Sequence, residues 1–290
     1  SNGTPSISAA NLTKLDGGAG NDTLGFEESG SNTSELTLTT AGATNFENII
    51  GTAGAETIKG DNNANVLTGK NGADTLYGYG GNDTLHADSN GSTNQTSSDV
   101  LYGGAGNDTL YGNAGDNTLD GGTGADTITS GGGSDMIVLR SGDGGATQSD
   151  GDTVTDFTDG TDSLGLDSSL TFSDLTIEQI GSDTVIKEGS NYLATLTGIS
   201  ISDITTLDFQ SADTSNQTIN GNSSNNTLIG GSGNDTFNGG AGNDTLLGWG
   251  GNDTFNIRSK TGSYADTVNG GAGTDTLDIS YSGVTSLANF

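Results

Sequence analysis

The sequence predicts an all-β protein made of two blocks of short, stacked parallel strands, which an antiparallel β capping segment separates. Two observations lead to this fold class. A nine-residue phrase returns many times in register, and the composition is too polar for one thick core, because only 29% of the 290 residues are apolar and 51 are glycine. Such a chain either stays disordered or stacks its few apolar residues repetitively. The regular spacing of the phrase favours the stacked solenoid.

Each phrase joins a turn rich in Gly, Asn and Asp to a three-residue strand with one apolar centre, as in GGAGNDTLY from Gly103. The apolar eighth position forms the expected core, while positions seven and nine face outward because side chains alternate along a strand. Strands this short are stable only when they stack on copies of themselves. Two phrases make one coil, so equivalent turns should be about 4.8 Å apart in space.

Breaks in the period divide the chain into five segments. They are the end of a preceding repeat unit with linker strands (1–50), a first block (51–140), an antiparallel β cap (141–215), a second block (216–278) and the start of a further, truncated unit (279–290). Polar insertions interrupt the first block at 87–98 and the second at 257–265. The cap would cover open sheet ends that otherwise promote aggregation. The two ends of the chain indicate an excerpt of a longer array.

Composition also limits the partners and the chemistry. With seven basic and 37 acidic residues the net charge is −30, so phosphate backbones and anionic lipids would repel the chain. No apolar run is long enough for a membrane span, and the first residues do not resemble an export signal. The absence of cysteine excludes disulfides and thiolate metal sites. A single histidine, His86, cannot build a conventional catalytic triad or zinc site. We therefore expect a module and not an enzyme.

An aspartate occupies the sixth position of nearly every phrase, and stacking would align these carboxylates in columns. Neighbours about 5 Å apart would repel each other by roughly 3 kcal/mol at an effective dielectric constant near 20. Several such pairs would cancel a typical domain stability of about 5–15 kcal/mol. Carboxylates and turn carbonyls together supply the roughly six to eight oxygens that calcium accepts, whereas magnesium requires a tighter octahedron and retains its waters. The columns therefore predict bound calcium.

The phrase is similar to the GGxGxDxUx nonapeptide of the RTX family of secreted proteins, whose repeats fold as a calcium-bound parallel β-roll. In that family, turn carbonyls and the sixth-position aspartate bind the metal. Carried over by position, the resemblance implies metal ligands at Gly18, Gly20, Asp22, Gly72, Asp74, Gly81, Asp83, Asp99, Gly104, Gly106, Asp108, Gly115, Asn117, Gly122, Gly124, Asp126, Gly131, Gly133, Asp135, Gly231, Gly233, Asp235, Gly240, Gly242, Asp244, Gly251, Asp253, Asp266, Gly271, Gly273 and Asp275. Turn pairs then suggest roughly six to twelve calcium ions.

Departures from the phrase suggest how the blocks begin and end. Glu56 and Asn65 hold the sixth position at the start of the first block, and Gln217 and Asn226 hold it in the second, so these units are interpreted as end caps. The stretch DTVTDFTDGTDSLGL from Asp152 resembles the DxVxDFxxGxDxL segment that follows RTX rolls in secreted proteases and alginate epimerases, where it is a structural cap.

The resemblance implies a structural segment of a larger secreted or cell-surface protein, exported by a type I system and folded by extracellular calcium. Three alternatives remain: an adhesive or polysaccharide-binding module, an ice-binding face, and the non-catalytic tail of a secreted enzyme. Tyr77 with Tyr102, and His86 with Tyr111, should stack on the outer faces and could contact a neutral glycan, since few basic residues are available for an anionic one. Threonine at position seven follows from strand propensity, and the turn threonine of ice-binding repeats is missing from most phrases.

Overall fold

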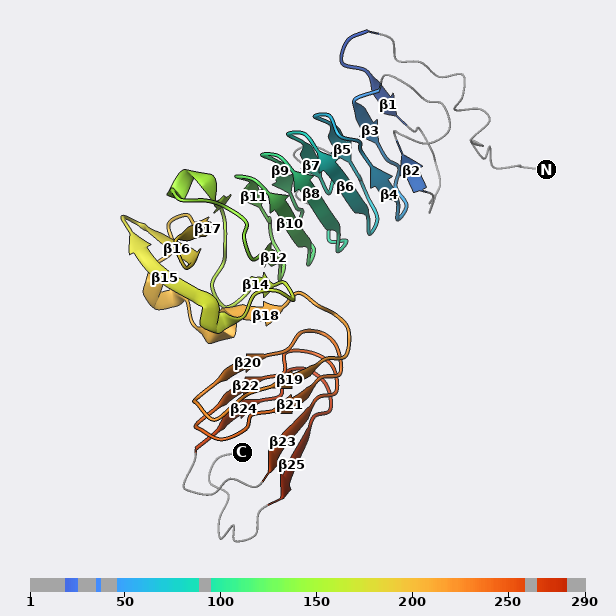
Figure 1. Cartoon of the computed structure of the whole chain (residues 1–290). Helices are drawn as coiled ribbons and strands as arrows, with labels where there is room; N and C mark the ends of the chain where they lie inside the picture. Colours follow the sequence, from blue (N-terminus) through green and yellow to red (C-terminus); the bar gives the residue numbers. More distant parts are fainter. Residues whose placement is uncertain (1–18, 26–34, 38–45, 89–94, 259–264, 281–290) are drawn as a thin grey trace, which may run out of the picture. The chain divides into compact units, whose positions relative to one another are not determined.

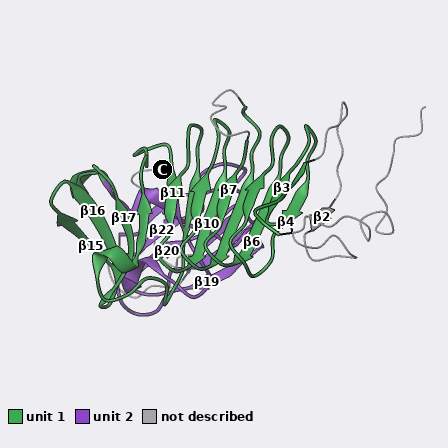
Figure 2. Ribbon diagram, turned by 90° about the horizontal axis from the view of Figure 1, so that it is seen from above, with its two compact units in different colours: residues 1–163, 176–203 green, residues 164–175, 204–290 purple. Residues whose placement is uncertain are grey.

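The computed structural model describes residues 19–25, 35–37, 46–88, 95–258 and 265–280. These residues form 25 strands and four short 3-10 helices. The chain divides into two compact units, Ser1–Ser163 with Thr176–Asp203 and Leu164–Leu175 with Ile204–Phe290, which Figure 2 distinguishes by colour. Among the described residues, no helix is long and apolar enough to cross a membrane.

The first unit contains two facing sheets of parallel strands, which appear in Figure 1 as a stack of blue to green arrows. Successive strands alternate between the sheets, so two phrases complete one coil. One sheet begins with β1 (Thr23–Gly25), β3 (Asn48–Ile50), β5 (Val66–Thr68), β7 (Thr84–His86), β9 (Thr109–Tyr111), β11 (Thr127–Thr129) and β13 (Asp152–Val154). The other contains β2 (Glu35–Thr37), β4 (Thr57–Lys59), β6 (Thr75–Gly80), β8 (Val100–Ala105), β10 (Thr118–Thr123) and β12 (Met136–Leu139). The predicted parallel solenoid is confirmed.

The polar insertion does not disturb the register of the coils. Thr57 pairs with Thr75 where the phrase is unbroken, and Thr84 pairs with Thr109 across the insertion. The sequence separation between stacked turns is 18 residues in the first case and 25 in the second. Seven additional residues are therefore accommodated in one turn, while the strands on both sides keep their partners.

The core of the first unit is a double row of aliphatic side chains between the sheets. Ile49, Ile58, Leu67, Leu76, Leu85, Leu101, Leu110, Leu119, Ile128 and Ile137 are fully buried. Most of them occupy position eight of the phrase, with the flanking strand residues partly exposed in the alternating pattern that was predicted. Burying one such side chain contributes about 1.5–3 kcal/mol. The thin core is sufficient because every coil adds the same contacts to its neighbours.

The segment after residue 140 continues the coil before any antiparallel pairing begins. β13 pairs in parallel with β11 and with β17 (Asn191–Leu196), and the antiparallel arrangement is confirmed where β16 (Asp183–Glu188) pairs with β17. β15 (Leu175–Ile180) follows β16 in the sheet order. The expectation that the stretch from Asp152 is antiparallel is therefore wrong. Its separations of 26 and 27 residues from the preceding turns concealed the periodicity.

The second unit has its own two parallel sheets. The strands are β19 (Thr218–Asn220), β21 (Thr236–Asn238), β23 (Thr254–Arg258) and β25 (Thr276–Ser280) in one sheet, with β20 (Thr227–Ile229), β22 (Thr245–Leu247) and β24 (Thr267–Asn269) in the other. Phe237, Leu246 and Phe255 form the buried core, and the two phenylalanine rings stack with centroids 4.7 Å apart. Leu164–Leu166, from β14 (Ser163–Leu166), pair in parallel with β18 (Phe209–Ser211).

Four single-turn 3-10 helices complete the described secondary structure. They are η1 (Gln148–Asp150) and η3 (Ile201–Asp203) in the first unit, and η2 (Phe172–Asp174) and η4 (Thr206–Asp208) in the second.

The Trp249 indole donates a hydrogen bond to the Phe209 carbonyl at 2.6 Å. Trp249 therefore contacts a neighbouring strand of its own unit, and its backbone φ of 69° shows the left-handed geometry of position two in the turn.

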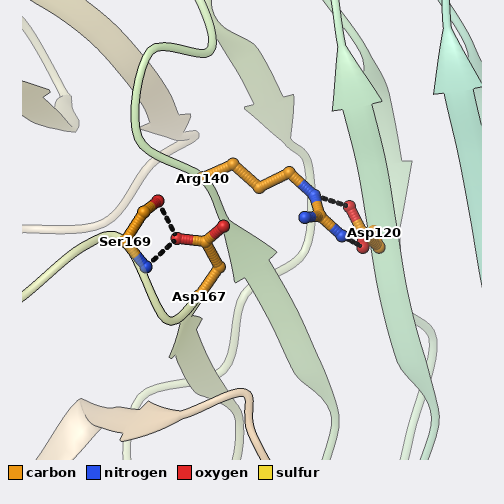
Figure 3. A network of polar contacts seen from close by, with 4 residues as sticks. All are labelled: Asp120, Arg140, Asp167 and Ser169. Carbon is orange, nitrogen blue, oxygen red and sulfur yellow. Dashed lines mark hydrogen bonds and ion pairs between the residues drawn. The ribbon is translucent and has the colours of Figure 1, made fainter.

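Stacked ring pairs and the Arg140–Asp120 ion pair join neighbouring coils of the first unit. Tyr77 stacks on Tyr102 and His86 stacks on Tyr111, each with ring centroids 4.9 Å apart, as predicted from their shared register. Arg140 reaches back to β10, where its Nε donates to Asp120 Oδ1 at 2.8 Å and its terminal nitrogen pairs with Oδ2 (Figure 3). Figure 3 also shows Ser169 of the second unit donating to Asp167 through its N–H and hydroxyl.

The glycines of the turns are required by geometry. Gly106 has a φ of 133°, and a Cβ added there would lie 1.8 Å from the carbonyl oxygen of Gly81 in the preceding coil. Gly160 has a φ of 70°, but an added Cβ would meet nothing within 4 Å. The turn glycines therefore permit both the backbone conformation and the close stacking of coils.

We predict that Gly106→Ala destabilises the folded chain by at least about 2 kcal/mol more than Gly160→Ala, which incurs only the left-handed strain of about 1–2 kcal/mol. The measurement is thermal unfolding of both variants in saturating calcium. Equal melting temperatures would show that the coils separate readily enough to admit a side chain, and would contradict the close stacking described above.

Candidate metal-binding turns

Sixth-position carboxylates stand in columns that backbone hydrogen bonds join. The Asp83 N–H donates to Asp108 Oδ1 at 2.7 Å, and the Asp108 N–H donates to Asp126 Oδ1 at 2.6 Å. The same bond joins Glu56 to Asp74, Asp74 to Asp99, Asp126 to Asp152 and Asp135 to Asp162 in the first unit, and Gln217 to Asp235, Asp235 to Asp253, Asp253 to Asp275, Asn226 to Asp244 and Asp244 to Asp266 in the second. One oxygen of each carboxylate is therefore committed to holding the coils together.

The other oxygen is buried and unpaired in many of these turns. Oδ2 has no hydrogen-bond partner among the described residues in Asp22, Asp74, Asp83, Asp108, Asp126, Asp135 and Asp253. Apart from Asp22, these side chains are at most 2% exposed. A buried polar atom without a partner costs about 1–3 kcal/mol, and more when it is charged. Each of these oxygens therefore needs a proton or a cation.

Burial raises the pKa of six of these aspartates, Asp74, Asp83, Asp108, Asp126, Asp135 and Asp253, above the usual value. Loss of hydration raises the pKa of Asp74 to about 8 and that of Asp83 and Asp135 to about 7, although the hydrogen bond from the preceding coil opposes the shift. Neighbouring acids add to it, as when Glu56 and Asp99 raise the pKa of Asp74. Protons and metal ions thus compete for the same oxygens near neutral pH.

Carbonyl oxygens lie beside the unpaired carboxylate oxygens. A Cβ added to Gly103 would lie 2.4 Å from Asp108 Oδ2 and 2.5 Å from the Gly121 carbonyl oxygen of the next coil. Similarly, a Cβ added to Gly124 would lie 2.0 Å from the carbonyl oxygen of Gly106 in the preceding coil. Each turn therefore gathers carboxylate and carbonyl oxygens around a space that only glycine leaves open.

The predicted glycine ligands take the expected places in these turns. Left-handed φ angles occur at position two in Gly104, Gly122, Gly131, Gly240 and Gly271, and at position four in Gly20, Gly72, Gly81, Gly106, Gly124, Gly133, Gly242, Gly251 and Gly273. Gly115, Gly231 and Gly233 occupy equivalent positions without a positive φ, and Gly18 lies outside the described residues. Metal ligation by these glycines and by the aspartates remains a prediction.

Side chains alone do not form a metal site in the described residues, because no three acidic, histidine or cysteine side chains converge at metal-binding distance. A metal ion in these turns would be held by backbone carbonyls together with one or two carboxylates. Calcium accepts such flexible oxygen ligation, while magnesium and zinc prefer smaller and more regular donor sets. The donor set therefore fits calcium.

One turn of the first unit satisfies its oxygens with side-chain amides. The Asn113 Nδ2 donates to Asp99 Oδ2 at 2.6 Å, and the Asn117 Nδ2 donates to the Gly115 carbonyl at 2.8 Å. The oxygens that stay unpaired in other turns are occupied here by N–H groups. Calcium is therefore needed less at Asn117 than at Asp108.

The ends of the columns differ from the sequence interpretation. Asn65 does not open its column, because β3 precedes it and the Asp22 N–H donates to Glu47 Oε2 at 2.7 Å. β2 likewise precedes β4 in the other sheet, so Glu56 does not open its stack of strands either, and the N–H and hydroxyl of Thr52 both donate to its carboxylate. The column with Asn65 therefore extends back to Asp22 through a glutamate that no glycine-rich phrase marks.

Sequence reasoning missed three aspartates at the other end of the first unit. Asp152 and Asp162 extend the two columns, and the Thr158 N–H donates to Asp162 Oδ2 at 2.8 Å. Asp156 accepts from the N–H groups of Ser130 and Gly131, both at 2.9 Å. Protein donors thus replace the cation at the final turn. The aspartate spacing of the stretch was visible, but it was interpreted only as a cap.

We predict that Asp108→Ala raises the calcium concentration needed for half-folding several-fold more than Asn117→Ala. Asp108 has an unpaired buried oxygen between Asp83 and Asp126, whereas Asn117 satisfies its turn through its amide. Calcium titrations followed by circular dichroism measure both midpoints. Equal shifts would contradict the assignment of metal to the unpaired oxygens.

We also predict that acid partly replaces calcium. A folded-state pKa raised from 3.8 to about 7 or 8 means that the metal-free fold gains stability below the unfolded pKa and loses it as pH rises through the folded pKa. In calcium-free buffer, the β-type circular dichroism signal should therefore increase as the pH is lowered from 8 to 4. The Asp74→Asn variant should show a larger β-type signal than the unaltered chain already at pH 7. A signal independent of pH in both proteins would count against buried, unpaired carboxylates.

A comparison with protein families supports the assignment of these turns to calcium-binding repeats. The family model described as the RTX calcium-binding nonapeptide repeat (4 copies) matches residues 14–24, 50–85, 95–128, 111–145, 216–255 and 260–278, together more than half of the chain. No curated protein sequence matches significantly.

Two solved structures are similar in part. The extracellular lipase LipA from Serratia marcescens is 20% identical, with a TM-score of 0.32 over 56% of this chain and 39% of the lipase. The AlgE6R3 subunit of the mannuronan C5-epimerase from Azotobacter vinelandii is 22% identical, with a TM-score of 0.21 over 67% of this chain and 87% of the subunit. The chain thus spans about two fifths of the length of the lipase. The family model matches the turns that carry the carboxylate columns. This chain therefore belongs to the RTX family and contains its calcium-binding β-rolls.

Proposed function

We propose that this chain is a calcium-dependent structural segment of a larger exported protein, which stays expanded where calcium is scarce and folds where calcium is abundant. The observation that carries the proposal is the row of buried, unpaired carboxylate oxygens in consecutive coils. Without cations these oxygens oppose folding, and with cations they hold successive coils together. Folding and calcium binding are then a single coupled process.

The proposed place of action is outside the cell. RTX repeats are typical of secreted proteins, and extracellular calcium modules bind at about 10⁻⁴–10⁻³ M, so the low calcium of the cytosol would leave the chain unfolded. An unfolded chain suits a type I export channel, and folding on arrival would prevent its return. The strongly acidic composition, with a net charge of −30, supports this dependence on cations.

The segment is proposed to have no catalytic activity of its own. The column carboxylates use Oδ1 to join coils, which leaves Oδ2 for a cation. His86 stacks flat against Tyr111, with an interplanar angle of 5°, and burial lowers the pKa of its imidazole. The chemistry of the columns therefore supports metal binding and not acid–base catalysis.

An adhesive or glycan-binding module is the alternative, because Tyr79 and Tyr111 are 47% and 39% exposed on the outer surface. The ring stacking weighs against it. Tyr77 stacks with Tyr102 of the next coil and with Tyr79, with centroids 4.9 and 5.9 Å away, and the Lys59 ammonium of the preceding coil lies over its ring at 6.0 Å. A sugar binds the open face of an aromatic ring, and the faces of Tyr77 are already covered. The stacked rings are better explained as pairs that stabilise neighbouring strands.

We predict cooperative folding with calcium. The chain should be expanded in chelator and gain β-type circular dichroism on addition of millimolar calcium, with roughly six to twelve ions bound. Magnesium at the same concentration is the control and should produce much less structure. Identical spectra in chelator and in calcium would overturn the proposed function.

We predict no reproducible glycan binding on an array in saturating calcium. The informative variant carries Tyr77→Ala and Tyr102→Ala together. Binding by the unaltered chain that this variant loses while keeping its calcium-induced fold would favour the adhesive alternative.

A further inference from the structure

A second set of side-chain hydrogen bonds joins the coils at position five of the phrase. Asn234 Oδ1 accepts the Asn252 N–H of the following coil at 2.6 Å, and the Asn234 N–H donates to Asn216 Oδ1 of the preceding coil at 2.9 Å. The same bond leads from Asn107 to Asn82, Ala125 to Asn107, Ser134 to Asp116, Asn243 to Asn225, Ala265 to Asn243 and Thr274 to Asn252. The nonapeptide pattern GGxGxDxUx leaves position five unspecified, so neither the pattern nor the carboxylate columns explain these side chains.

The N–H of position five belongs to the same peptide group as the carbonyl of position four. In a planar trans peptide these two bonds point in opposite directions, so an acceptor that holds the N–H also directs the carbonyl. The turn of Asn234 shows both halves of this arrangement. Its N–H points to the preceding coil, whereas the Gly233 carbonyl oxygen would lie 2.2 Å from a Cβ added to Gly251 in the following coil. The Gly251 carbonyl oxygen is directed at Gly273 in the same way, at 1.7 Å from an added Cβ.

The carbonyls that these bonds direct belong to glycines that the family resemblance implies as calcium ligands. They are those of Gly106, Gly124, Gly133, Gly233, Gly242, Gly251 and Gly273. Among the described residues, the Gly233 and Gly251 carbonyls accept no backbone hydrogen bond, which leaves their oxygens for a cation. A ligand that is oriented in advance binds a metal more tightly, because the protein does not have to order it when the ion arrives.

The first coils lack this arrangement, although their backbone follows the same path. Ala55 and Ala64 occupy position five there, and an alanine side chain has no acceptor for the N–H groups of Ala73 and Asn82 in the coils that follow. The direction of the position-four carbonyl is therefore supported by particular side chains and not by the stacking of coils alone.

We propose that the position-five asparagine is a positioning residue for calcium, which points the glycine carbonyl of the next coil toward the space between stacked turns before the ion binds. It acts through the peptide group and does not touch the metal. Asp116 has the same role where aspartate replaces asparagine. The proposal rests on calcium binding by the chain, and it assigns a function to a position that the nonapeptide pattern leaves open.

The test compares three variants of the full chain. Asn234→Ala removes the acceptor for the Asn252 N–H and so releases the Gly251 carbonyl. Asn234→Asp keeps an acceptor oxygen, as Asp116 does in its own turn, and should rescue the effect. Ser232→Ala is the matched control, because Ser232 is an exposed residue of the same turn, two positions before Asn234. Asn234 is itself exposed, so its substitution leaves the buried core intact.

Terbium in place of calcium gives the readout. Its emission is excited through Trp249, the only tryptophan of the chain, which lies in the same turn as Gly251. The emission lifetimes in H2O and D2O count the water molecules on the bound ion. At saturating terbium we expect about one more water on the ion in Asn234→Ala, since a released carbonyl is replaced by solvent. Its calcium midpoint for folding should rise several-fold, while Ser232→Ala and Asn234→Asp stay close to the unaltered chain.

A raised midpoint with an unchanged number of waters would show that Asn234 only stabilises the fold, and would overturn the positioning role. Unchanged values of both quantities in Asn234→Ala would overturn it as well, while leaving calcium-dependent folding intact. Absence of calcium and terbium binding by the unaltered chain would instead overturn the proposed function. If Asn234→Ala does not fold, Asn216→Ala releases the Gly233 carbonyl at the first coil of the second unit and is judged by the same two measurements.

Discussion

The structure depends on how a column of buried carboxylates is neutralised. Stacking coils at strand spacing forces like charges into rows, and the turns place them out of water, so both repulsion and lost hydration oppose the fold. In the columns, one carboxylate oxygen accepts a backbone N–H from the preceding coil, and in turns such as that of Asp108 the other oxygen is buried without a partner. The hydrophobic rows inside the sheets hold the coils in line, but the state of the columns decides whether the stack is stable.

The chain neutralises its turns in three chemical ways. Among the described residues, the turns with Asp22, Asp74, Asp83, Asp108, Asp126, Asp135 and Asp253 leave Oδ2 unpaired, and those turns fit a metal ion. The turn with Asn113 and Asn117 uses amide N–H groups, while the final turns use backbone N–H groups that donate to Asp156 and Asp162. Metal dependence therefore varies along one regular backbone. The side chains that cause the variation are few, and each acts within a single turn.

The regular part of this architecture could be read from the sequence, whereas the exceptions could not. Position eight predicted the buried row, and the shared register predicted that Tyr77 would stack on Tyr102. Glu47, Asp152 and Asp162 were missed because no copy of the nonapeptide ends in them, although hydrogen bonds place them in the columns. Periodicity reveals residues that repeat a pattern. It does not reveal residues that join the same column when the number of residues between stacked turns differs from 18.

The insertion in the first unit shows how such a scaffold can diversify. Stacked turns are 25 residues apart there instead of 18, yet the strand pairing and the carboxylate bonds on both sides are unchanged. Lengthening a loop costs little free energy, because closure entropy grows only logarithmically with length. A coil that accommodates a longer loop can expose new side chains to solvent, while its strand pairing and its buried row of apolar side chains stay the same. Evolution, or an engineer, can vary the exterior of this solenoid one turn at a time.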